Sequence, residues 1–93
     1  MRVIGYIDHP DLKISVFKMD NRLSVKFENA WYEQTYKFGS DDRVSTLESV
    51  QNIVNEGFIN EVLAQMQHMH RVRLEALARA FPVATEEPFE EII

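Results

Sequence analysis

The fold of this chain is decided by residues 13–38, which read KISVFKMDNRLSVKFENAWYEQTYKF. Apolar and polar side chains alternate along this stretch, as in β-strands that bury only one face. Two interruptions, Asp20-Asn21 and Asn29-Ala30, each contain a residue that favours tight turns. The stretch therefore predicts three consecutive antiparallel strands, with approximate bounds 11–19, 22–28 and 31–38.

A two-residue turn fixes which residues stand opposite each other in the two strands that it joins. Both predicted turns place apolar residues together on one side of the sheet and polar or charged residues together on the other. A shift by one residue would exchange the two faces, so the agreement of both turns supports the register. The expected pairs are Val16 with Val25, Ile14 with Phe27, Phe27 with Tyr32, Lys26 with Glu33, and Ser24 with Thr35.

A first strand is predicted at residues 2–8 and is joined to the next strand through His9-Pro10. Proline cannot donate a backbone hydrogen bond, so it fits the turn better than a strand interior. The simplest pairing places Ile7 opposite Leu12. The sequence thus predicts a four-stranded antiparallel meander in the order 1-2-3-4, with one apolar face that needs a cover.

The helical part of the chain follows the sheet. Ser45 with Glu48 three residues later predicts a capping box, so a helix is expected to begin near Thr46. Gly57 fits a helix C-cap, which would divide the stretch before a second helix at 58–81. Apolar residues nevertheless keep three- or four-residue spacing across this glycine. A broken helix and a continuous helix both remain open.

We therefore predict a single α+β domain at residues 1–81, with the sheet at 1–38 and a long or kinked helix at 45–81 covering one face. The segment 58–81 spans ~36 Å as a helix, whereas a typical strand of this sheet spans about 26 Å. The helix is therefore expected to overhang the sheet. Its apolar residues also occupy more of the helix circumference than packing on the sheet alone requires, which favours a second contact with a partner subunit.

The composition is that of an ordinary globular protein, with 93 residues, 45% hydrophobic, 27% charged and no cysteine. The absence of cysteine excludes disulfides and metal sites with thiolate ligands. No apolar run approaches the ~20 residues of a membrane helix, so we expect a cytoplasmic protein without membrane contact. The net charge of −5 argues against nucleic acid as a partner, because no segment carries the cation density that phosphate binding needs.

Candidate catalytic and metal sites are weak in this sequence. His68 and His70 are two residues apart, so on a helix they point about 200° from each other and cannot share an ion. Asp8, His9 and Asp11 surround a turn, which a polar hairpin explains as well as a metal site does. We expect no catalytic residue, no metal, no cofactor and no enzyme activity.

The more informative candidate is the second face of the sheet, which mixes polar residues with apolar ones. Ile4, Tyr6 and Phe17 fall close together in the expected register, and Met19 and Trp31 add apolar area near two turns. Such a cluster fits a protein interface, a face covered by the tail or helix, or plain exposure. Aromatic side chains on a sheet also stack the bases of single-stranded RNA, although the mixed charges argue against that use.

The leading functional hypothesis is a non-enzymatic, homodimeric protein-interaction or regulatory module. One alternative is a binder of small molecules or single-stranded nucleic acid on the aromatic sheet face. Another is an enzyme whose site forms only between subunits and uses His9 or His70. The candidate interface comprises residues of the mixed sheet face and of the helix, namely Ile4, Tyr6, Phe17, Met19, Trp31, Met69, His70, Arg73 and Leu77.

Residues 82–93 form an acidic tail with four glutamates and with the apolar residues Phe89, Ile92 and Ile93. The spacing of the three apolar residues allows a short helical turn that docks into a groove. The basic residues expected near the glutamates, within the chain or across a dimer, are Arg71, Arg73 and Arg79.

Overall fold

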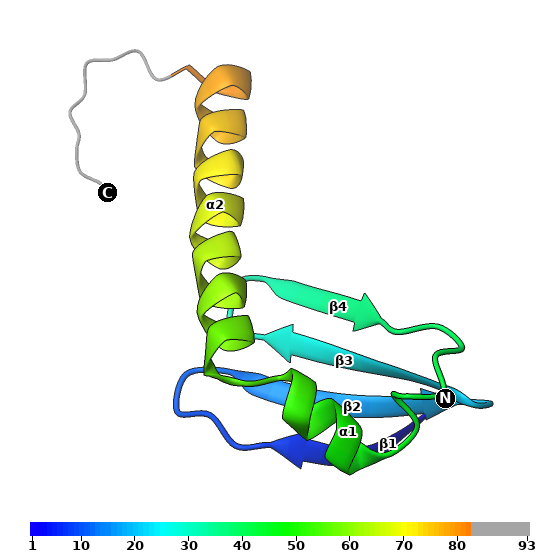
Figure 1. Ribbon diagram of the computed structural model, residues 1–93. Coiled ribbons are helices and arrows are strands. Elements are labelled where there is room, and N and C mark those ends of the chain that lie inside the picture. Colours follow the sequence, from blue (N-terminus) through cyan, green and yellow to red (C-terminus); the bar gives the residue numbers. More distant parts are fainter. Residues whose placement is uncertain (83–93) are drawn as a thin grey trace.

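The computed structural model describes residues 1–82 and shows the predicted α+β arrangement. Four antiparallel strands form one sheet in the order β1-β2-β3-β4 (Figure 1). Residues 83–93 lie outside the described residues, and with them the contacts predicted for the acidic tail. The elements are β1 (Arg2–Ile7), β2 (Lys13–Met19), β3 (Arg22–Glu28), β4 (Glu33–Lys37), α1 (Leu47–Ile53) and α2 (Glu56–Ala80).

The β2–β3 hairpin has the predicted register. Val16 stands opposite Val25, and Ile14 stands opposite Phe27. The turn between the strands places Asp20 at a φ of 56°, in the left-handed region that aspartate tolerates better than most residues do. The prediction holds here because alternation and turn chemistry both specify the same register.

The β3–β4 register differs from the prediction by two residues, so that Phe27 stands opposite Gln34 and not opposite Tyr32. The turn is longer than two residues because Asn29 closes it with its side chain. Asn29 Oδ1 accepts hydrogen bonds from the backbone N–H of Trp31 and of Tyr32, each at 2.8 Å. An even shift leaves every side chain on its predicted face. Also wrong for this reason are the pairs of Lys26 with Glu33 and of Ser24 with Thr35.

The β1–β2 pairing also differs from the prediction, because Ile7 stands opposite Ile14 and not opposite Leu12. The register shifts between Val3 and Gly5, where β1 has a β-bulge. A bulge adds one residue to one strand only, so residues before and after it follow different alternations. A pattern of strict alternation therefore assigns part of this strand to the wrong face.

The bulge corrects the prediction for Ile4, which we expected on the mixed face beside Tyr6 and Phe17. Ile4 is partly buried and packs against the core. Val3 stands opposite Phe17 instead and is 42% exposed. The mixed face, called the open face from here on, therefore carries Val3 in place of Ile4.

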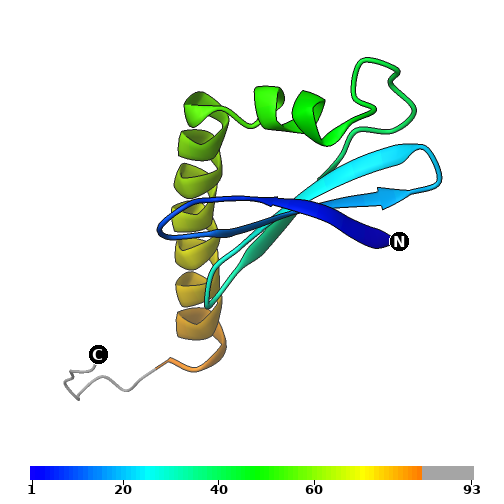
Figure 2. The same ribbon diagram turned by 90° about the horizontal axis from the view of Figure 1, so that it is seen from below.

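The core lies between the apolar face of the sheet and the two helices, which lie on the same side of it (Figure 2). Phe27 is fully buried near its centre and stacks on Phe58 of α2, with ring centroids 5.5 Å apart. Tyr36 of β4 meets both rings edge-on. The buried core residues are Leu12, Ile14, Val16, Leu23, Val25, Phe27, Val44, Val50, Val54, Val62 and Met66.

The helical stretch is broken, and the break lies at Val54 and Asn55, before Gly57. Asn55 is the N-cap of α2, and its side chain accepts a hydrogen bond from the Phe58 N–H at 2.9 Å. Gly57 therefore lies inside the first turn of α2 and is not a C-cap. Asparagine is favoured at the N-cap of a helix, so Asn55 was a sequence signal for the start of α2. The prediction overlooked it because Gly57 was taken as a C-cap.

Helix α1 begins one residue later than its predicted capping box implies. Thr46 is the N-cap and forms the capping box with Ser49. The Ser49 N–H donates to Thr46 Oγ1 at 3.1 Å, and the Thr46 N–H donates to Ser49 Oγ at 3.0 Å. The box predicted between Ser45 and Glu48 is therefore wrong, although the predicted helix start near Thr46 is close.

We predict that Gly5→Ala destabilises the fold through α1. A Cβ atom at Gly5 would lie 2.7 Å from Leu47 Cδ2, so the leucine must move or the helix must shift. Overpacking of this kind costs about 1–3 kcal/mol. Chemical denaturation should show this loss, and the loss should shrink when Leu47→Ala is already present.

Gly57→Ala is the matched control for this prediction. A Cβ atom at Gly57 meets only Asn55 Oδ1, at 3.4 Å, and alanine favours helix. This variant should be as stable as the natural chain or more stable. An equal cost of Gly5→Ala with and without Leu47 would contradict the packing of α1 on the bulge.

Candidate functional site

Helix α2 is attached to the sheet through its first half. The Gln34 side chain of β4 donates a hydrogen bond from Nε2 to the Val62 carbonyl at 2.9 Å. Asn29 of the β3–β4 turn donates from Nδ2 to Met66 Sδ at 3.3 Å. Met69, a predicted interface residue, is partly buried against the core and thus serves packing within the chain.

The β3–β4 turn makes the last contacts with α2. The Tyr32 hydroxyl lies 2.8 Å from His70 Nδ1, and the Arg73 guanidinium lies over the Trp31 ring, 5.0 Å from its centroid. The structure thus brings together three predicted interface residues, Trp31, His70 and Arg73. Their contact is intramolecular and was not expected, because Trp31 was assigned to the open face with Tyr6.

The end of α2 projects beyond these contacts as an arm, residues 74–81. Every described residue of α2 after Met69 is exposed, including Leu74 at 47% and Leu77 at 42%, and the C-cap Phe81 is 71% exposed. Figure 1 shows the helix standing away from the sheet, and the described part of the chain measures 56 × 24 × 20 Å. The overhang predicted from the helix length is therefore present.

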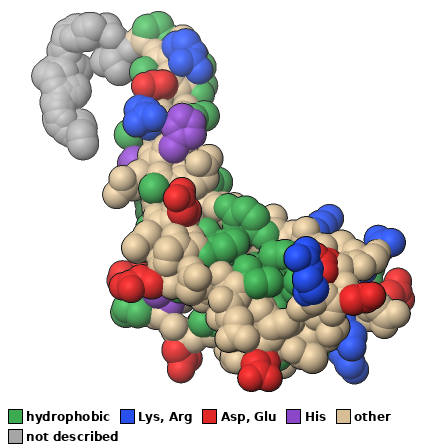
Figure 3. Space-filling model, viewed as in Figure 1, with side chains coloured by type: hydrophobic (Ala, Val, Ile, Leu, Met, Phe, Trp, Pro, Cys, Tyr) green, Lys and Arg blue, Asp and Glu red, His purple; other side chains and the backbone are tan. Residues whose placement is uncertain are grey.

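The apolar side chains of the arm continue the side of α2 that packs on the sheet. Leu77 follows Met66 by eleven residues, which is about three helical turns, so both point in nearly the same direction. Leu74 and Phe81 lie three and four residues from Leu77, about 60° and 40° round the helix from it and both to the same side. In Figure 3, hydrophobic side chains reach the surface in this upper part of the helix. The core stripe therefore extends past the sheet that covers it.

The open face of the sheet carries a groove of about 400 Å³. Phe17 and Met19 of β2 line it together with Lys26 of β3 and Lys37 of β4. Lys26 Nζ lies 5.5 Å from the centroid of the Phe17 ring and 3.5 Å from a carboxylate oxygen of Glu28. The groove therefore combines an apolar surface with cationic side chains.

Tyr6 lies on the open face outside this groove, 58% exposed and opposite Ser15. Ser15 is only 2% exposed on the same face, so neighbouring side chains cover it. Of the predicted aromatic trio, Tyr6 and Phe17 share the open face, while Trp31 packs with α2 at the β3–β4 turn. The three side chains do not form one continuous stacking surface.

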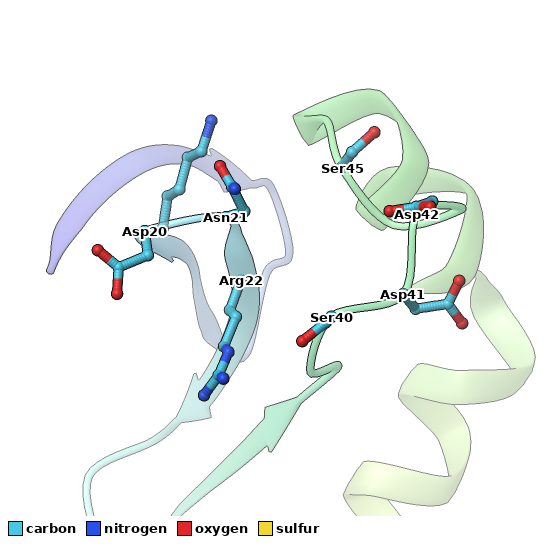
Figure 4. Close-up of a pocket in the computed structure, with 8 residues that line it drawn as sticks. Asp20, Asn21, Arg22, Ser40, Asp41, Asp42 and Ser45 are labelled. Carbon is cyan, nitrogen blue, oxygen red and sulfur yellow. The ribbon is translucent and has the colours of Figure 1, made fainter.

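A polar pocket of about 480 Å³ lies between the β2–β3 turn and the loop that joins β4 to α1. Figure 4 shows Asp20 and Arg22 on one side of it and Asp41 and Asp42 on the other. Asp41 is bound by Arg43, whose Nη2 lies 2.7 Å and Nε 3.0 Å from its carboxylate oxygens. Within residues 1–82, no three His, Cys, Asp or Glu side chains are grouped to hold a metal ion.

Asp41 has the clearest electrostatic signature of this loop. Hydrogen bonds from the Arg43 side chain and then from its backbone N–H lower the pKa of Asp41 from 3.8 to about 2. The same ion pair raises the pKa of Arg43. The Asp41 carboxylate is thus bound by Arg43 of the same loop, so its lowered pKa is explained by a structural role.

We predict that Arg43→Gln raises the pKa of Asp41 toward 3.8, because the guanidinium donors are lost. A lowered carboxyl pKa stabilises the fold above pH 3.8, and this contribution disappears as the pH falls through about 2. NMR titration of the Asp41 carboxyl carbon measures the shift. Lys18→Gln, which removes a cation from the same pocket, should leave this pKa unchanged. Titration of natural Asp41 near 3.8 would contradict the ion pair.

No protein-family model matches this sequence, and no curated protein or solved structure shows significant similarity to it. No helix in the part of the chain that the structure describes is long and apolar enough to cross a membrane. The functional interpretation therefore depends on the arm and on the groove. The predicted interface contained Leu77, Phe17 and Met19 but left out Leu74, Phe81, Lys26 and Lys37. Helical spacing already gave Leu74 and Phe81 as apolar residues of the overhanging helix, and strand alternation placed both lysines on one face.

Proposed function

We propose that this chain is a small, non-enzymatic protein-interaction module that forms a homodimer through the arm of α2. In the dimer, the apolar side of one arm packs against a second copy of the chain. The open face remains available to a further protein partner. This division assigns self-association to the arm and recognition to the groove.

One observation carries the proposal: the stripe that packs on the sheet continues through Leu74, Leu77 and Phe81, which no other part of residues 1–82 covers. An apolar stripe at helical spacing is the usual seam of helix–helix association. Holding it in water at the end of a projecting helix is unfavourable, because Leu74 and Leu77 are 47% and 42% exposed and each forgoes about 1 kcal/mol of further burial. A second copy supplies the same stripe and removes both from water.

We predict that Leu77→Glu converts a dimer into a monomer. The substitution places a charge in the centre of the proposed seam, where burial without a partner is costly. Light scattering coupled to size-exclusion chromatography at micromolar concentration should give twice the chain mass for the natural protein and one chain mass for the variant. Circular dichroism should show the same helix content apart from fraying of the arm.

Val72→Glu is the matched control, because Val72 is 50% exposed on the same helix. It lies about 140° round the helix from Leu77 and therefore outside the stripe. This variant should remain dimeric. A natural protein that is monomeric at micromolar concentration would refute the proposal, and dimers disrupted equally by both variants would refute the role of the stripe.

A further inference from the structure

A second groove, of about 430 Å³, lies between the β3–β4 turn and the middle of α2. We call it the turn groove, to separate it from the groove on the open face. Trp31 is 67% exposed at its side, although Arg73 lies over one face of the ring. The residues that line the turn groove are Asn29, Trp31, Tyr32, Leu63, Met66, Gln67 and His70. The groove therefore leaves aromatic and apolar surface in water next to the arm.

The turn groove and the arm belong to one side of α2. Six residues on this side recur with the alternating four- and three-residue spacing of the a and d positions of a coiled coil. They are Leu63, Gln67, His70, Leu74, Leu77 and Phe81. The first three line the turn groove, and the last three form the stripe of the arm. The groove thus continues the seam of the arm toward the sheet.

The arm alone is too small for a stable interface. Residues 74–81 make about two helical turns, whereas a stable protein interface involves roughly 20–30 residues on each side. The proposed homodimer therefore needs further apolar surface next to the arm, and the turn groove supplies it. Because the groove and the arm share one seam, one helix of a second copy can cover both.

We propose that the two α2 helices of the homodimer pack antiparallel and that Phe81 of each copy inserts into the turn groove of the other. Leu74 of one copy then meets Leu77 of the second copy at the centre of the contact. In an antiparallel pair each step forward along one helix is a step back along the other, so Phe81 meets His70. Such docking rests on the proposed homodimer and specifies its site and its direction.

The direction follows from where each copy carries its sheet. In a parallel pair both sheets would lie at the same end of the seam, and neither arm would reach a turn groove. In an antiparallel pair the arm of one copy lies where the other copy has its groove. Phe81 then meets the aromatic rings of Trp31, Tyr32 and His70, which pack well with a phenyl ring. His70 Nδ1 already lies 2.8 Å from the Tyr32 hydroxyl, so this polar atom has a partner within its own copy.

The single tryptophan of the chain lies in the turn groove, so its fluorescence reports on the groove directly. Its emission should shift to shorter wavelength as the protein concentration rises through the dimer range measured by light scattering, because the indole ring leaves water. Phe81→Ala should raise the dissociation constant of the dimer by roughly tenfold or more, since each copy loses a buried phenyl ring. Val72→Ala is the matched control and should change neither quantity, because Val72 lies outside the seam and is 50% exposed.

Quenching between copies tests the contact itself. Chains that combine Trp31→Phe with a nitroxide on Phe81→Cys are mixed with natural chains, so that Trp31 can be quenched only by the second copy. The chain has no cysteine of its own, so the label occupies one site. Quenching should appear at dimer concentrations and disappear when the nitroxide is reduced. The same label on Val72→Cys is the control and should quench far less.

The outcomes separate the docking from the homodimer. A dimer whose Trp31 emission is the same at every concentration would overturn the docking of Phe81 and leave the homodimer standing. Equal quenching from the labels at positions 72 and 81 would do the same. A natural chain that is monomeric at micromolar concentration would overturn the homodimer and the docking together.

Discussion

The contact between Phe58 and Phe27 is the interaction on which the rest of the structure depends. It fixes the first turn of α2 on the centre of the sheet, and Tyr36 holds both rings from the side. The hydrogen bonds from Gln34 to the Val62 carbonyl and from Asn29 to Met66 then direct the helix over the β3–β4 turn and past the edge of the sheet. The exposed arm is therefore a consequence of where α2 is anchored and of how long it is.

The fold was largely predictable because one face of the sheet is buried. Because Val16, Val25 and Phe27 must be buried, the residues that alternate with them along each strand face away from the core. A register shift by an even number of residues leaves every side chain on the same face. The strand register was less predictable where a turn is closed by a side chain or a strand contains a bulge. Asn29 lengthens one turn with its own carbonyl oxygen, and the bulge before Gly5 changes the alternation of β1. Neither the length of this turn nor the position of the bulge can be deduced from hydrophobic periodicity alone.

The candidate surfaces were predictable only in part for the same reason. Leu77 follows from helical spacing, and Phe17 and Met19 follow from strand alternation. Trp31 was misplaced because its position depends on the length of the turn and on Arg73, 42 residues later in the sequence. The position of Lys37 in the groove depends on the true register, in which it stands opposite Ser24.

The central proposal is that α2 has an anchored first half and an arm that a second copy of the chain covers. Amide hydrogen exchange along α2, measured over a range of protein concentrations, tests it most directly. Residues 59–66 should exchange slowly at every concentration. Residues 74–81 should exchange rapidly when dilute and become protected as the concentration rises through the dimer range. Protection of the arm that does not change with concentration would contradict the claim.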